Sequence, residues 1–139
     1  MNAKALKVAY ILVMLSCLVI ALTGCGSSSS SDSTPVASTV QVVDCSTVTS
    51  AATVTATASN TFSPQTVTVA PNGVVKWISA SNVAHTVTSG TAGTANGLFN
   101  QNLSASGSSV CLKFTTAGTF NYYCTFHYTM GMTGTVTVQ

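Results

Sequence analysis

Charge is the scarcest property of this sequence. Its 139 residues include four Lys and Arg and two Asp and Glu, so that charged residues make up 4% of the chain and the formal net charge is +2 at pH 7. A protein that binds nucleic acid needs clustered lysine and arginine side chains, and the sequence contains no such cluster. We therefore exclude nucleic acid as a partner. Long-range electrostatic steering of a protein partner is excluded for the same reason.

The N-terminal segment has the pattern of an export signal. Lys4 and Lys7 provide a positive start, and a mostly apolar run follows over residues 8–20. The next segment, Leu-Thr-Gly-Cys at residues 22–25, resembles the bacterial lipoprotein cleavage box, in which the cysteine is lipidated before cleavage. A transmembrane helix is the alternative, but the apolar run is short for a membrane span.

The sequence thus predicts three parts. Residues 1–24 are expected to be a lipoprotein signal peptide, and residues 25–35 a tether that begins with the lipidated Cys25 and contains five consecutive serines. Residues 36–139 are long enough for one domain with a single core. We expect an exported protein, anchored by its lipid at the periplasmic or extracellular face of a bacterial membrane.

Helical periodicity is absent from the sequence after the tether, and an alternation of polar and apolar residues takes its place. Period two is typical of half-buried strands, and Gly, Pro and Asn separate the segments. The chain is therefore predicted to be an all-β sandwich without substantial helix. Residues 89–109, rich in Gly, Ser and Asn, are expected to be a surface crossover with a short ordered stretch near Leu98 and Phe99. The predicted strands cover residues 53–57, 66–69, 74–78, 86–88, 110–114, 119–123 and 134–138.

Three cysteines follow the tether, and disulfides persist in an oxidising compartment. Because three is an odd number, at least one has another role. Cys124 has metal-binding residues near it, which leaves Cys45 and Cys111 as a candidate disulfide, with two buried free thiols as the alternative. In its strand Cys111 is expected to point outward, away from the core face that Val110 and Leu112 share.

The segment around Cys124 carries the chemistry. Cys124, His127 and Met132 lie within nine residues on a predicted connection between two strands, and His85 begins an earlier strand. Thiolate, imidazole and thioether form a soft ligand set that suits copper, and two histidines and a cysteine with a weak axial methionine make a blue-copper site. Singly, such residues are more often ordinary core residues. Their combination in a sequence with two histidines favours a metal site.

These motifs resemble the cupredoxin family, and the plastocyanin and pseudoazurin type most of all. The resemblance implies a Greek-key β-sandwich or barrel of about seven to eight strands, with one type 1 copper per chain held by His85, Cys124, His127 and Met132. Met130 is the competing axial ligand. Thr86 stands where the family often has asparagine, which puts in doubt the side-chain hydrogen bond expected there. The matching segments are Phe62-Ser63-Pro64, residues 73–77, residues 85–89, residues 118–124 and residues 127–136.

The resemblance implies single-electron transfer rather than an enzymatic reaction. Copper enzymes need additional histidines, and a dinuclear centre needs a second cysteine on the ligand loop; the sequence has neither. A copper carrier or storage module remains the alternative, and a metal-free adhesion fold is disfavoured because all four ligands are present. We expect a monomer whose redox donor and acceptor dock on the apolar surface around His127, beside Phe126 and Tyr128.

Overall fold

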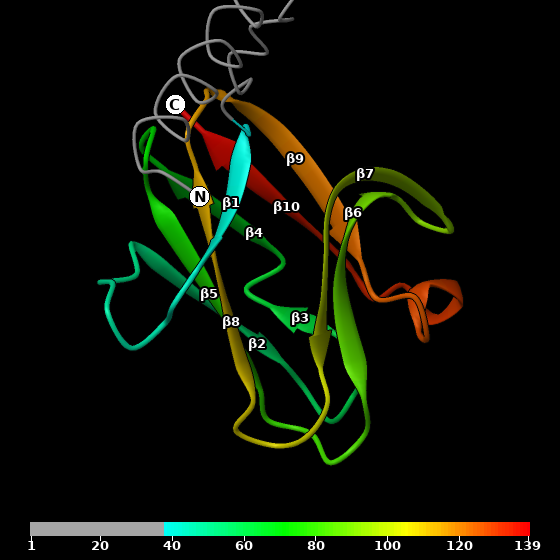
Figure 1. Ribbon diagram of the computed structural model, residues 1–139. Helices are drawn as coiled ribbons and strands as arrows, with labels where there is room; N and C mark the ends of the chain where they lie inside the picture. The colour runs from blue at the N-terminus through cyan, green and yellow to red at the C-terminus, as the bar shows by residue number, and fades with distance from the viewer. Residues whose placement is uncertain (1–37) are drawn as a thin grey trace, which may run out of the picture. The chain divides into compact units, whose positions relative to one another are not determined.

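Residues 38–139 are the part of the chain that the computed structural model describes, and they form two five-stranded sheets that pack face to face (Figure 1). The predicted signal peptide, Cys25 and the tether lie outside the described residues. The all-β prediction is confirmed, although ten strands are present instead of seven or eight. All seven segments predicted as strands are strands. Within residues 38–139, the helical residues are a single 3₁₀ turn, η1 (Tyr128–Met130), and no helix is long and apolar enough to cross a membrane.

The first sheet has the strand order β1-β8-β5-β2-β3, in which only the β5–β2 pair is parallel. Its strands are β1 (Val40–Val43), β2 (Ala52–Ala56), β3 (Phe62–Ser63), β5 (Val74–Ser79) and β8 (Ser109–Phe114).

The second sheet has the order β4-β10-β9-β6-β7, with a parallel pair between β4 and β10. Its strands are β4 (Thr66–Val69), β6 (His85–Thr91), β7 (Thr94–Leu103), β9 (Gly118–Tyr123) and β10 (Thr133–Val138).

The core lies between the sheets because alternate residues of most strands point inward. In β10, for example, every second residue is buried. Trp77 of one sheet packs edge-to-face against Tyr122 of the other, with ring centroids 5.3 Å apart. Gly134 permits this packing, because a Cβ at that position would overlap the Tyr122 ring. Large aromatic and smaller aliphatic side chains therefore interdigitate in the core.

The prediction for residues 89–109 is wrong. In place of a crossover, β6 continues to Thr91, turns tightly and pairs with the ten-residue edge strand β7. The sequence hides β7 because most of its side chains are exposed, so that it lacks the apolar alternation of a half-buried strand. Backbone pairing to β6 holds it in place, together with the buried side chains of Phe99 and Leu103.

Candidate metal centre

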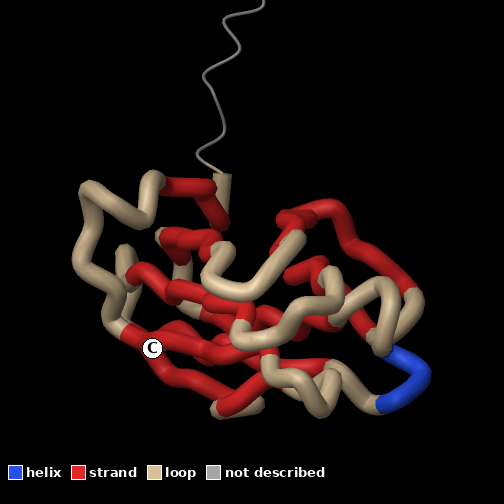
Figure 2. The backbone as a smooth tube through the Cα atoms, turned by 90° about the horizontal axis from the view of Figure 1, so that it is seen from below, coloured by secondary structure: helices blue, strands red, loops and turns tan. Residues whose placement is uncertain are grey.

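The four predicted ligands come from two neighbouring strands and one connection of the second sheet. His85 is the first residue of β6, and Cys124 follows the last residue of β9. His127 and Met132 lie on the connection from β9 to β10, on either side of η1. Figure 2 shows this turn at one end of the sandwich, far from the C-terminus. Residues 39 positions apart in the sequence thus meet because β6 pairs with β9.

Three of the four predicted ligands face one another. The Nδ1 atoms of His85 and His127 lie 3.2 Å apart, and the Cys124 Sγ atom lies 3.4 Å from Nδ1 of His127 and 3.9 Å from Nδ1 of His85. Within residues 38–139, this is the only group of three or more such side chains close enough to share a metal ion. His85 and Cys124 are buried, while His127 is partly exposed. The site is thus reached from solvent on the His127 side.

Backbone hydrogen bonds shape the loop. The N–H of Cys124 donates to the carbonyl of Met132 over 3.0 Å, and the N–H of Met132 donates to the carbonyl of His127 over 3.2 Å. Gly131 closes η1 with φ of +86°, a conformation that favours glycine. These backbone hydrogen bonds therefore hold Cys124, His127 and Met132 in one compact loop.

Burial distinguishes the two methionines of the loop. Met132 is fully buried and belongs to the hydrophobic core, whereas Met130 is 60% exposed. A thioether that is fixed in the core can act as an axial ligand, while an exposed one is free to change rotamer. The structure therefore favours Met132.

The pKa of His85 is lowered, first by burial and second by repulsion from His127. Burial in a medium of low dielectric constant disfavours the charged imidazolium form. A neutral imidazole is the form that binds a metal. The environment of His85 thus prepares it for coordination.

The structure resolves the doubt over Thr86. Its hydroxyl accepts a hydrogen bond from the N–H of Thr125 over 2.9 Å, and its own N–H points to the Cys124 Sγ atom over 3.4 Å. The side chain of Thr86 thus forms a hydrogen bond with Thr125, the residue that follows the ligand cysteine. Sequence reasoning missed the contact of this hydroxyl with Thr125, because it depends on the pairing of β6 with β9.

Comparisons with known proteins agree with this geometry. Residues 48–139 match the family of copper-binding proteins of the plastocyanin/azurin type. The chain is a cupredoxin. Plastocyanin of Scenedesmus fuscus is 34% identical over 84 residues, which cover 56% of this chain and 86% of the plastocyanin.

Two solved cupredoxin structures are similar to this one. The purple cupredoxin of Nitrosopumilus maritimus is 26% identical with a TM-score of 0.56, and the match covers 63% of this chain and 99% of that protein. A point mutant of amicyanin in its reduced Cu(I) form is 25% identical with a TM-score of 0.55, covering 73% of this chain and 99% of that protein.

The residues of this cupredoxin fit the copper cofactor of its family. Two imidazole nitrogens and a sulfur converge, and a buried methionine completes the set of a type 1 site. Family membership implies electron transfer through this copper site, and cupredoxins are generally electron carriers rather than enzymes. Members of the family are typically exported.

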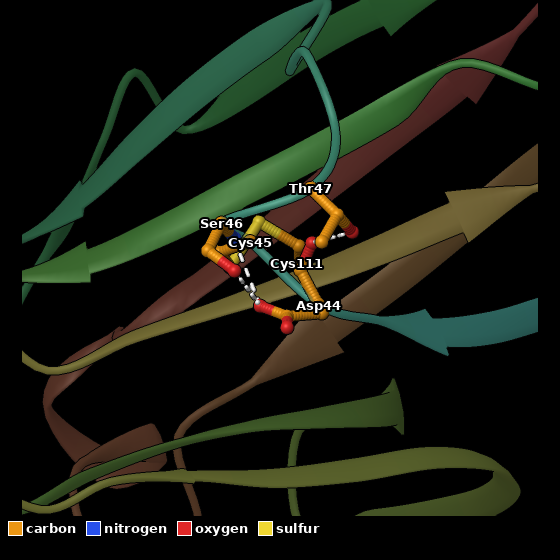
Figure 3. Close-up of a disulfide and its surroundings, with 5 residues drawn as sticks. All are labelled: Asp44, Cys45, Ser46, Thr47 and Cys111. Atoms are coloured by element: carbon orange, nitrogen blue, oxygen red, sulfur yellow. Dashed lines mark hydrogen bonds between the residues drawn. A yellow bond between two sulfur atoms is a disulfide. The ribbon is translucent and has the colours of Figure 1, made fainter.

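The strand β1 and Cys45 precede the segment that matches the family. Cys45 forms a disulfide with Cys111 of β8, and the two Cα atoms lie 5.3 Å apart (Figure 3). The side chain of Asp44 accepts hydrogen bonds from the backbone and the hydroxyl of Ser46, which lower the pKa of Asp44. The disulfide thus attaches the segment after β1 covalently to β8 of the first sheet.

Proposed function

We propose that this cupredoxin is an exported, lipid-anchored carrier of single electrons, with one type 1 copper held by His85, Cys124, His127 and Met132. The observation that carries the proposal is the convergence of two imidazole nitrogens on the buried sulfur of Cys124. Copper bound there supplies a one-electron couple. A site built from strand ends and a tight loop keeps its shape when the charge changes, so little rearrangement opposes the transfer.

The ring of His127 offers the route for electrons to a partner. It is the partly exposed ligand, and exposed apolar side chains occupy its own loop: Phe126 and Met130 are each 60% exposed and Tyr128 is 37% exposed. Within residues 38–139 the only Asp, Glu, Lys and Arg residues are Asp44, Lys76 and Lys113. Donor and acceptor are therefore proposed to dock briefly on an apolar surface, with little dependence of the rate on salt.

A copper carrier or storage module is the second candidate, favoured by the exposed thioether of Met130 beside the site. The full burial of Cys124 and Met132 opposes it, because a metal that must be handed over needs exposed ligands. The rate of copper loss to a competing chelator separates the two functions. Loss over hours supports the electron carrier, and loss within seconds supports the copper carrier.

Titration of the full chain with Cu(II) tests the metal site. We expect an intense visible thiolate-to-copper band that saturates at one copper per chain, together with a type 1 spin-resonance spectrum. Cys124→Ser abolishes the band, and Met132→Leu changes the spectrum. Met130→Leu is the matched control and leaves it unchanged. Colourless binding would contradict the proposal.

The lipid anchor has a separate test, which does not depend on copper. The proposal predicts that the chain expressed with its own N-terminus sediments with membranes and is released by detergent. Cys25→Ala removes the sulfur that would carry the lipid, and incorporation of labelled fatty acid into the protein is then expected to be lost. Labelling that survives the substitution would contradict lipid anchoring at Cys25.

A further inference from the structure

A chain of polar groups links the exposed edge of the second sheet to the ligand cysteine. The hydroxyl of Thr88 donates to the Oδ1 atom of Asn100 over 2.8 Å, and the hydroxyls of Thr86 and Thr88 lie 3.0 Å apart. The Thr86 hydroxyl accepts the N–H of Thr125, the residue after Cys124. Thr88 and Asn100 are directly opposed in the β6–β7 pairing, which explains their contact.

The direction of these hydrogen bonds follows from the number of protons. A hydroxyl has one proton and two lone pairs. Thr88 gives its proton to Asn100, so it can only accept from Thr86. The single proton of Thr86 is shared between two acceptors, the hydroxyl of Thr88 at 3.0 Å and that of Thr125 at 3.2 Å, and its lone pairs remain for the N–H of Thr125. Hydrogen bonds that point the same way polarise and strengthen one another.

Without Asn100 the hydrogen bond between Thr86 and Thr88 can reverse its direction. The proton of Thr88 would be free to turn to Thr86, whose proton has a second acceptor in the hydroxyl of Thr125, 3.2 Å away. Thr86 and Thr88 are almost fully buried, at 4% and 2% exposure, so in the intact protein their hydroxyls depend on protein partners. Removal of the Asn100 side chain therefore weakens the contacts of Thr86 with Thr125 and with the sulfur of Cys124.

We propose that Asn100 is a positioning residue for Cys124, acting through Thr88 and Thr86, and that it raises the reduction potential of the centre. The proposal rests on the electron-transfer function proposed above. Reduction places more negative charge on the sulfur, which then accepts the N–H of Thr86 more strongly. A well-positioned donor thus favours the reduced form, and a loosened donor lowers the potential.

The first test compares Asn100→Ala with Asn102→Ala in the copper-loaded full chain. Asn102 lies on the same strand two residues further on, is exposed, and its side chain makes no hydrogen bond among residues 38–139. Asn100→Ala is expected to lower the Cu(I)-to-Cu(II) affinity ratio about threefold to tenfold, where tenfold is about 59 mV for a one-electron couple. Asn102→Ala is expected to leave it unchanged. Equal potentials for Asn100→Ala and the unmodified protein would overturn the proposal, as would equal shifts for both variants.

A double-mutant cycle tests the route. Thr88→Val removes the central hydroxyl and is expected to lower the potential on its own, whereas Thr88→Ser keeps the hydroxyl and the potential. In the Thr88→Val background Asn100→Ala has nothing further to disrupt, so no additional shift is expected. Additive shifts would show that Asn100 acts by another route, and they would overturn the proposal.

A third readout needs no copper. Amide hydrogen exchange of Thr125 in the metal-free protein reports its bond to Thr86 directly, and it is expected to be faster in Asn100→Ala than in Asn102→Ala. Equal rates would overturn the polar chain itself. If copper binding failed while this difference persisted, the proposed electron-transfer function would fall and the hydrogen-bonded chain would stand.

Discussion

Cys111 and Cys124 are both buried, yet their surroundings give them opposite chemistry. Cys111 lies within β8, where the segment after β1 brings Cys45 to it and the two sulfurs are joined. Cys124 lies beyond the end of β9, where the neighbours of its sulfur are two imidazole nitrogens and the N–H of Thr86. Burial alone therefore does not decide what a cysteine does. The role of each cysteine depends on which segment of the protein reaches its sulfur.

The two cysteines also differ in how their geometry is held. At Cys111 one covalent bond fixes the added strand to the sheet. At Cys124 backbone hydrogen bonds of the loop and the contacts of Thr86 fix the ligands, and the sulfur keeps its lone pairs for a metal. The first arrangement contributes stability, and the second contributes a binding site. Separate measurements of stability and of the copper spectrum can test this division.

The largest expected effect is the loss of the disulfide. Replacing both Cys45 and Cys111 by alanine opens a link that spans 66 residues, and loop-closure entropy predicts a loss of about 4 kcal/mol in the free energy of unfolding. The visible copper band is expected to remain, because neither residue contacts the metal centre. Chemical denaturation and absorption spectra measure the two quantities. A changed copper spectrum would show that the disulfide also influences the metal centre.

The methionines give the next effect. Met132→Ala removes a fully buried thioether from the core and is expected to lower the unfolding free energy of the metal-free protein by about 2–5 kcal/mol. The same variant is expected to alter the copper spectrum. Met130→Ala, at a position that is 60% exposed, is the matched control and is expected to change neither quantity. If both variants behaved alike, burial would not be what selects the axial ligand.

Alkaline pH is expected to destabilise the core through the buried Tyr122. Burial raises the pKa of Tyr122 from 10.0 to about 12, so its neutral form is favoured in the folded protein. This stability is fully present below pH 10 and is lost as pH rises to about 12; it amounts to at most about 3 kcal/mol. Denaturation of the metal-free protein at pH 9 to 12 measures it. Tyr122→Phe is expected to remove this part of the pH dependence, and an unchanged profile would contradict the assignment.

Acid pH is expected to lower the stability of the metal-free protein through His85. The lowered pKa of His85 means that its contribution to stability is present above its ordinary value of 6.5 and is lost as pH falls through the lowered pKa. Metal-free protein is therefore expected to be less stable at pH 4.5 than at pH 7.5. His85→Gln should flatten this dependence, while the Cys45 and Cys111 double variant should keep it. A steep dependence that survives His85→Gln would place the acid-sensitive group elsewhere.

Local patterns in the sequence were sufficient for most of the fold. The alternation in residues 66–69 and 134–138 predicts β4 and β10 closely, because each strand has one buried face and one face that is exposed in β4 and partly buried in β10. The edge strand β7 could not be predicted in this way. Its stability comes from hydrogen bonds to β6, which the composition of its own side chains does not reveal. The short strands β1 and β3 depend on pairing in the same way.

The class of site follows from the ligand residues alone, because thiolate, imidazole and thioether at these spacings suit one kind of metal chemistry. The sequence also limited the partners, since a chain with so few charges cannot steer them over long distances. Three features depend on the folded arrangement of the strands: Cys45 reaches Cys111, Met132 is buried while Met130 is exposed, and Thr86 connects Cys124 to Asn100 through Thr88. The reason is physical: ligand chemistry belongs to individual side chains, whereas burial and hydrogen-bond partners arise when distant strands pair.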